Sequence, residues 1–166
     1  MLRIVIADQW DRGNDMFGRG FVRNPPQQEW NQIAKNDRAR ETETLRLLQS
    51  GALKSGKDFG YAALVFQHSA DANGILLAHV LSIVAVSRGD KNGLWLAAAS
   101  LDRYLIDMKQ PQVFGTQFLE GTATQPPTMD PYNRAALTDA ERALLNVPSL
   151  KQQLATLASM SAAHHR

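Results

Sequence analysis

The chain has 166 residues, of which 44% are hydrophobic and 20% are charged, with a formal net charge of +2. This length and composition are those of one folded globular domain, so we expect a single domain over residues 1–166. The 18 basic residues are spread among 16 acidic ones, which excludes the basic stripe expected of a nucleic-acid-binding protein. The absence of cysteine excludes disulfides and thiolate chemistry. The longest apolar run, residues 74–86, is too short to span a bilayer, so we expect a soluble, cytoplasmic protein without a membrane partner.

Hydrophobic residues recur at helical spacing over most of the first 108 residues. The first segment is ambiguous, because Ile4, Val5 and Ile6 also favour a strand. The clearest helix follows, with Asn24 as a possible cap and Gly51 at its end. The expected helices are residues 24–51, 58–69, 71–87 and 92–108, arranged as antiparallel neighbours. The third is apolar on nearly every side, so we expect it at the centre of the bundle.

The pattern changes after Met108, where Gly, Pro, Thr and Gln replace the helical period. Residues 113–119 and 122–125, joined by a turn at Glu120 and Gly121, predict a small β-hairpin. Two short helices, at about residues 138–145 and 149–161, are expected to follow, and residues 162–166 should fray. The predicted fold class is therefore mainly α, a single-domain antiparallel helical bundle with a small β-hairpin after the fourth long helix.

Asp102 is the clearest polar residue on an apolar stripe. Its neighbours at helical spacing are all apolar: Ala98, Ala99, Leu105 and Ile106. Burial of a carboxylate without a partner is costly, so we expect a partner. Arg103 comes next and could bind a neighbouring helix or an anionic ligand. A structural ion pair between helices explains this pattern as well as a functional site does.

His68 follows Gln67 near the end of a predicted helix, with Asp71 three residues on. A neighbouring carboxylate and the negative end of a helix both favour an imidazolium ion, which suits a general acid or an anion-binding group. The alternative is a histidine that caps helix carbonyls. A metal site of His68, Asp71 and His79 is a weaker interpretation, because the spacing matches no known ligand motif. We therefore predict no metal and no cofactor.

Two further polar groups are candidates for ligand binding. Asp8, Gln9 and Arg12 lie near the start, where Asp8 and Arg12 have the spacing of a helical salt bridge. The neutral donors and acceptors Gln112, Thr116 and Gln117 surround Gly115, which permits close approach of the backbone. The chain contains no nucleophile elbow, phosphate loop, dinucleotide fingerprint or zinc helix, so no standard reaction is indicated.

Four segments, DQWDR, FQHS, DRYL and QPQVFGTQF, resemble in order and spacing the bacterial domain of unknown function 6624 family. The pattern of that family reads DQ-x-x-R, QH, DR and Q-x-[YF]-G-T-Q, and the resemblance covers about residues 5–145. Phe114 occupies the aromatic position where tyrosine is common. The resemblance implies one shared site but no established activity. That site would contain Asp8, Gln9, Arg12, Gln67, His68, Asp102, Arg103, Gln112, Gly115, Thr116 and Gln117.

Two functions are consistent with these patterns. In the first, the polar motifs converge on one pocket for a small polar or anionic ligand, with His68 and Asp102 as catalytic residues and Arg12 or Arg103 holding negative charge. In the second, the chain is a helical protein interaction module, and the same residues only join helices and hairpin. Polar residues from four separate segments favour the pocket. The patterns identify no protein partner.

Overall fold

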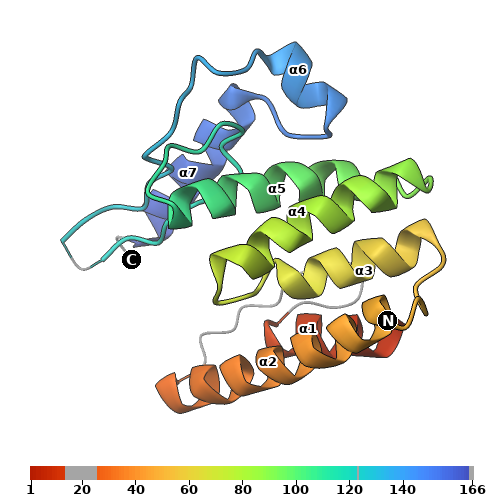
Figure 1. Ribbon diagram of the computed structural model, residues 1–166. Coiled ribbons are helices and arrows are strands. Elements are labelled where there is room, and N and C mark those ends of the chain that lie inside the picture. Colours follow the sequence, from red (N-terminus) through yellow and green to blue (C-terminus); the bar gives the residue numbers. More distant parts are fainter. Residues whose placement is uncertain (14–25, 123, 165–166) are drawn as a thin grey trace. The chain divides into compact units, whose positions relative to one another are not determined.

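The computed structural model describes residues 1–13, 26–122 and 124–164 (Figure 1). These residues form seven helices and no strand, which confirms the mainly helical class. The chain divides into two compact units, Met1–Gly93 and Leu94–Arg166. The expectation of one domain over residues 1–166 stays a prediction. No helix of the described residues is long and apolar enough to cross a membrane.

Four helices build the first unit, and α3 contacts the other three (Figure 1). Their bounds are α1, Leu2–Asp11; α2, Gln27–Gln49; α3, Gly56–Phe66; and α4, Ala72–Ser87. The ambiguous first segment is therefore a helix. The second helix begins after Pro26 as its N-cap, two residues later than Asn24 would place the cap, and Asn24 itself lies outside the described residues. Gly51 follows the end of α2 with a φ of +64°, as expected of a residue that terminates a helix.

Local signals start α3 and α4. The Ser55 hydroxyl accepts the backbone N–H of Asp58, whose carboxylate accepts the N–H of Ser55, and this reciprocal pair satisfies two donors at the start of α3. Asp71 caps α4 by accepting the N–H of Asn73. Both helices therefore begin within two residues of the positions that the sequence predicted.

Small residues let α3 and α4 pack closely. Four alanines, Ala62 and Ala63 of α3 and Ala78 and Ala85 of α4, are fully buried. A side chain added at Gly56 would lie 2.9 Å from the carbonyl oxygens of both Ala85 and Arg88. Because backbone atoms cannot move aside easily, any larger residue at position 56 would push the start of α3 away from the end of α4.

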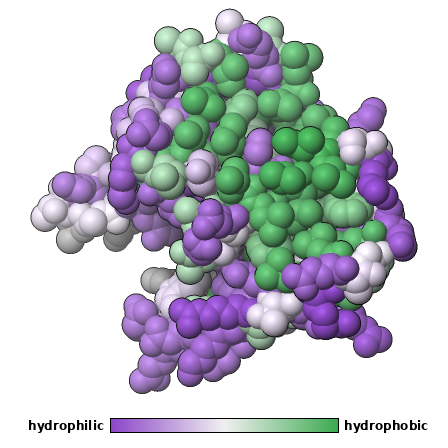
Figure 2. Space-filling view, in the orientation of Figure 1, coloured by the Kyte–Doolittle hydropathy of each residue, from purple (hydrophilic) through white to green (hydrophobic). Residues whose placement is uncertain are grey.

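α1 and α2 bury few apolar side chains. The buried residues of α1 are Val5 and Asp8, and those of α2 are Ile33 and Thr44. Trp30, in the first turn of α2, is 44% exposed. In Figure 2, hydrophilic residues cover α2, whereas hydrophobic residues gather over α4. Polar contacts must therefore contribute much of what holds α1 and α2 in place.

The second unit contains α5 from its second residue onward, together with α6 and α7. Their bounds are α5, Gly93–Asp107; α6, Asp139–Leu144; and α7, Leu150–His164. Ala98, Phe114 and Val147 form the centre of a small apolar core, with four partly buried side chains around it: Leu101, Val113, Leu137 and Leu145. The core joins α5 to the long segment that precedes α6.

The predicted β-hairpin of residues 113–125 is wrong, because the described residues contain no strand. The backbone N–H groups that a strand would use are bonded to side chains instead: Asp102 accepts those of Val113, Phe114 and Thr116. Only isolated bridges remain in this described segment, such as the antiparallel pair of Leu119 and Thr128. The pattern of residues resembles that of a hairpin, but the acceptor of these three N–H groups is a distant side chain rather than a second strand.

Candidate functional site

The strongest candidate site in the first unit is the contact between His68 and Asp8. Nδ1 of His68 lies 3.0 Å from Oδ2 of Asp8, sixty residues earlier in the chain. His68 follows the end of α3, and Asp8 lies on α1. The Asp8 side chain is 1% exposed, whereas that of His68 is 17% exposed. His68 is therefore the more exposed member of a pair whose carboxylate is buried.

Asp8 is the centre of several polar contacts. Its Oδ2 accepts a hydrogen bond from the Gln9 amide at 2.8 Å, and its Oδ1 accepts one from Nη1 of Arg12 at 2.9 Å. Nε of Arg40 lies 3.7 Å from the same Oδ1. The salt bridge for which Asp8 and Arg12 have the spacing is therefore present, and it is part-buried.

A second carboxylate, Asp37 on α2, closes a ring of four alternating charges. Its Oδ2 lies 2.6 Å from Nη2 of Arg12, and its Oδ1 lies 3.0 Å from Nη2 of Arg40. Both arginines also contact Asp8, so each charge in the ring has two neighbours of opposite sign. Asp11 extends the ring, because its Oδ2 accepts hydrogen bonds from both terminal nitrogens of Arg40.

The pKa of Asp8 lies below its usual value. Burial alone raises the pKa of this carboxyl, but the hydrogen bond from His68 and the charges of His68 and Arg12 lower it by more. Asp8 is therefore ionised at neutral pH, and an ionised carboxylate only accepts hydrogen bonds. It follows that Nδ1 of His68 carries a proton and donates a hydrogen bond to the carboxylate of Asp8. In the neutral ring, the lone pair is then on Nε2, as in a general base held by a carboxylate.

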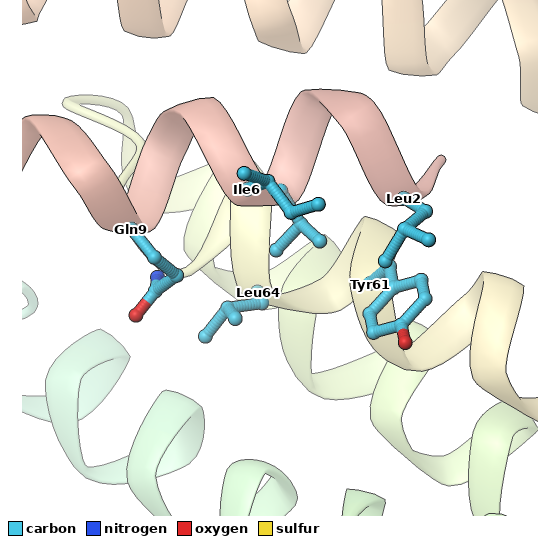
Figure 3. Close-up of a pocket in the computed structure, with 6 residues that line it drawn as sticks. Leu2, Ile6, Gln9, Tyr61 and Leu64 are labelled. Carbon is cyan, nitrogen blue, oxygen red and sulfur yellow. The ribbon is translucent and has the colours of Figure 1, made fainter. Parts of the chain in front are cut away.

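A small apolar cavity lies beside this cluster, between α1 and α3 (Figure 3). Its volume is about 50 Å³. The lining residues are Leu2, Val5, Ile6, Gln9, Tyr61 and Leu64. Gln9 both lines the cavity and donates to Asp8, so it connects the cavity to the His68 pair.

Asp102, in the second unit, is fully buried on α5 and anchors a loop. Its Oδ1 accepts the N–H groups of Val113 and Phe114, and its Oδ2 accepts both the N–H and the hydroxyl of Thr116, all within 2.9 Å. The expected burial of Asp102 is confirmed, and its partners are loop donors. Four donors occupy the accepting positions of the carboxylate, which is the arrangement of a structural anchor.

The remaining residues of the QPQVFGTQF motif brace the same loop. The fully buried Gln112 donates to the carbonyl of Gln117 at 3.0 Å and accepts the N–H of Gln117 at 3.0 Å. The Gln117 amide in turn donates to the carbonyl of Ala99 on α5. Gly115 has a φ of +74°, and a Cβ there would lie 2.7 Å from Tyr132, so both the turn and the packing require glycine.

Arg142 of α6 was not singled out by sequence reasoning, although it is the largest fully buried side chain of the described residues. Its guanidinium donates to the carbonyls of Phe114 and Leu137 and to the hydroxyl of Tyr132. Gln153 of α7 donates to the same Phe114 carbonyl at 2.8 Å. The signal was absent from the sequence, because the flanking residues of this short helix do not form an apolar stripe around Arg142.

The missed residues of the first unit, Asp37 and Arg40, did carry a signal. They lie four and seven positions after the buried Ile33, and Thr44, eleven positions after it, is also buried. This spacing places all four residues on one face of α2. The criterion that found Asp102 does not find them, because the neighbours of Arg40 at helical spacing are all polar: Asn36, Asp37, Glu43 and Thr44.

Two other predicted site residues have less defined surroundings. Gln67 is 7% exposed, and its Oε1 accepts no hydrogen bond within the described part of the chain. Arg103 is half-buried on α5.

His68 lies in the first unit and Asp102 and Gln117 in the second, so the predicted convergence of these three on one pocket stays a prediction. Across residues 1–13, 26–122 and 124–164, no three His, Asp or Glu side chains are grouped to hold a metal ion.

Comparison with known proteins gave no relative: no family model, curated protein or solved structure matches this chain. The resemblance to the bacterial domain of unknown function 6624 family stays a prediction.

Proposed function

We propose that the side chains around His68 form a site for a small polar or anionic ligand, in which His68 exchanges a proton with the ligand. The observation that carries this proposal is the 3.0 Å contact between Nδ1 of His68 and the buried, ionised Asp8. A carboxylate in this position orients the ring and stabilises the positive charge that the ring gains when it takes a proton.

The other polar residues of the first unit have supporting roles in this proposal. Arg12 helps to keep Asp8 ionised, and Arg12 and Arg40 together fix its position, because each contacts it while also contacting Asp37. Asp102 is assigned a structural role, since its four bonds hold the loop that contains Thr116. The proposed resemblance to the bacterial family agrees with this choice, because its first two motifs contain Asp8, Gln9, Arg12 and His68.

The first test measures which nitrogen of His68 carries the proton. Neutral histidine in water favours a proton on Nε2, whereas donation to Asp8 requires it on Nδ1. We expect ¹⁵N ring shifts of His68 above its titration to report the Nδ1–H form, and Asp8→Asn to weaken that preference. His79→Gln removes a ring signal from α4 and serves as the matched control. An Nε2–H form in the parent protein would contradict the proposal.

The second test measures ligand binding. The probes are a set of small carboxylates, phosphates and amides, and binding is read as a rise in the unfolding temperature. A rise that occurs in the parent and in His79→Gln, and is lost in His68→Gln, supports the site. An equal rise in all three proteins places binding elsewhere.

A second candidate function, a protein interaction module, is favoured by one observation. Trp10 on α1 is 63% exposed and Trp30 on α2 is 44% exposed. Tryptophan is enriched at protein interfaces, where its large apolar surface supplies binding energy. If Trp10→Ser removes binding of a protein partner while His68→Gln leaves it intact, this alternative replaces the first.

A further inference from the structure

We infer that the apolar cavity between α1 and α3 is the subsite for a short, branched apolar group of the ligand, whose polar end lies toward His68. This inference rests on the proposed function of His68. It names a substrate class: a small amphipathic molecule with a branched aliphatic group next to an amide, hydroxyl or carboxylate.

The position of the cavity supports this inference. In Figure 3, Leu2 and Tyr61 lie at one end of the cavity, and Gln9 and Leu64 lie toward the other. Leu64 is four residues before His68, and the N–H of His68 bonds to the carbonyl of Val65, so the helical turn continues to His68. Leu64 and His68 therefore face the same side.

Gln9 connects the apolar and polar parts of the site. It lines the cavity, and its amide donates to Oδ2 of Asp8 at 2.8 Å. The same oxygen of Asp8 lies 3.0 Å from Nδ1 of His68. A ligand whose apolar group contacts Leu64 thus has its next atoms beside Gln9, which is bonded to the carboxylate that contacts His68.

The size of the cavity limits the apolar group. A cavity of about 150 Å³ lined by apolar residues binds benzene. The volume here, about 50 Å³, is one third of that, which leaves room for about two carbon atoms, such as the two methyl groups at the branch of an isopropyl group. Leu2 and Ile6, which line the cavity from α1, are 46% and 38% exposed, so this wall of the cavity borders solvent.

The test uses isovaleramide, isovalerate and isoamyl alcohol, which share one branched group and differ in the polar end. Acetamide, with a single methyl group, is the control probe. Binding is followed by NMR through the methyl signals of Val5, Ile6 and Leu64 and the ring signal of His68. We expect isovaleramide to shift all of them and to bind at least about tenfold more tightly than acetamide, because three further carbon atoms leave water.

Matched variants localise the effect. Leu64→Phe fills the cavity and should weaken isovaleramide binding on the order of tenfold, while Leu154→Phe, on an exposed position of α7, should not. Ile6→Phe fills the cavity from α1 and replaces Leu64→Phe if that variant does not fold. Equal binding of acetamide and isovaleramide, or no effect of either filling variant, overturns the inference.

Different NMR signals test the subsite and the proposed function of His68. Methyl shifts without a shift of His68 mean that the cavity binds apolar groups apart from the histidine, which overturns the subsite. No methyl shift at millimolar probe also overturns it, while the ¹⁵N measurement on His68 decides the proposed function independently. A wrong tautomer of His68 removes the proposed function and this inference together.

Discussion

Arg12 joins the end of α1 to the middle of α2 through Asp37, with Nη2 of the arginine 2.6 Å from Oδ2 of the aspartate. Both side chains are less than one sixth exposed, at 15% and 13%. Asp37 also contacts Arg40, so this one carboxylate faces two guanidinium groups. The contact lies between helices that bury few apolar residues, and its loss should affect how α1 is held.

We expect Asp37→Asn to lower the free energy of unfolding by about 2 to 3 kcal/mol, because two partly buried arginines lose a shared charge partner. The measurement is chemical denaturation of the parent and the variant. Glu43→Gln on the same helix is the control, since Glu43 forms an exposed pair with Arg46 and its loss should change nothing measurable. Equal stability of Asp37→Asn and the parent would show that the ring does not stabilise the fold.

Asp102→Asn should destabilise the second unit by about 3 kcal/mol, because an amide presents one accepting oxygen to four donors. Hydrogen exchange of the Val113, Phe114 and Thr116 amides should become faster. Asp107→Asn, at an exposed position of the same helix, is the control. Unchanged exchange of these three amides in Asp102→Asn would rule out the anchor role.

Asp8 should contribute to stability in a defined range of pH. Its pKa in the folded protein lies below the ordinary value of 3.8, so the unfolded chain takes up the proton first as the pH falls. The contribution is fully present above about pH 3.8 and is lost as the pH falls through the lower, folded pKa. The stability difference between the parent and Asp8→Asn should therefore shrink as the pH falls from the ordinary value of 3.8 through the lower, folded pKa. A difference that stays constant over this range contradicts the lowered pKa.

Glu41 on α2 should show the opposite dependence. Burial raises its pKa above 4.5, as do the charges of Asp37 and Asp71, against a hydrogen bond from Ser69 that lowers it. Ionisation of Glu41 is thus less favourable in the folded protein than in the unfolded chain. The free energy of unfolding therefore falls as the pH rises above 4.5 and through the folded pKa of Glu41. Glu41→Gln should raise the unfolding temperature more at about pH 7 than at about pH 4. Equal effects at the two values would show that the carboxyl has no raised pKa.

The helices could be predicted because their signals are local. The spacing of apolar residues, the Ser55 and Asp58 pair and the Asp71 cap all lie within a few residues of the ends that they define. The burial of Asp102 could be predicted in the same way, from the residues one turn away on its own helix.

The partners of these residues could not be predicted, because they are distant in the chain. Asp71 was the expected carboxylate near His68, but the structure shows that the contacting carboxylate is Asp8, which lies sixty residues away. The loop around Gly115 resembled a hairpin for the same reason. Its backbone donors bond to Asp102, and no local pattern distinguishes a donor that bonds to a strand from one that bonds to a buried carboxylate.

The order of charges in the ring also fixes the register of α1 against α2. Asp8 faces Arg40 and Arg12 faces Asp37, so the two helices pair in opposite directions. A slip of one helical turn, about 5.4 Å, would place Asp8 opposite Asp37 in one direction and Arg12 opposite Arg40 in the other. Either slip exchanges attraction for repulsion between like charges. These four charged residues therefore restrict α1 to a single docked position against α2.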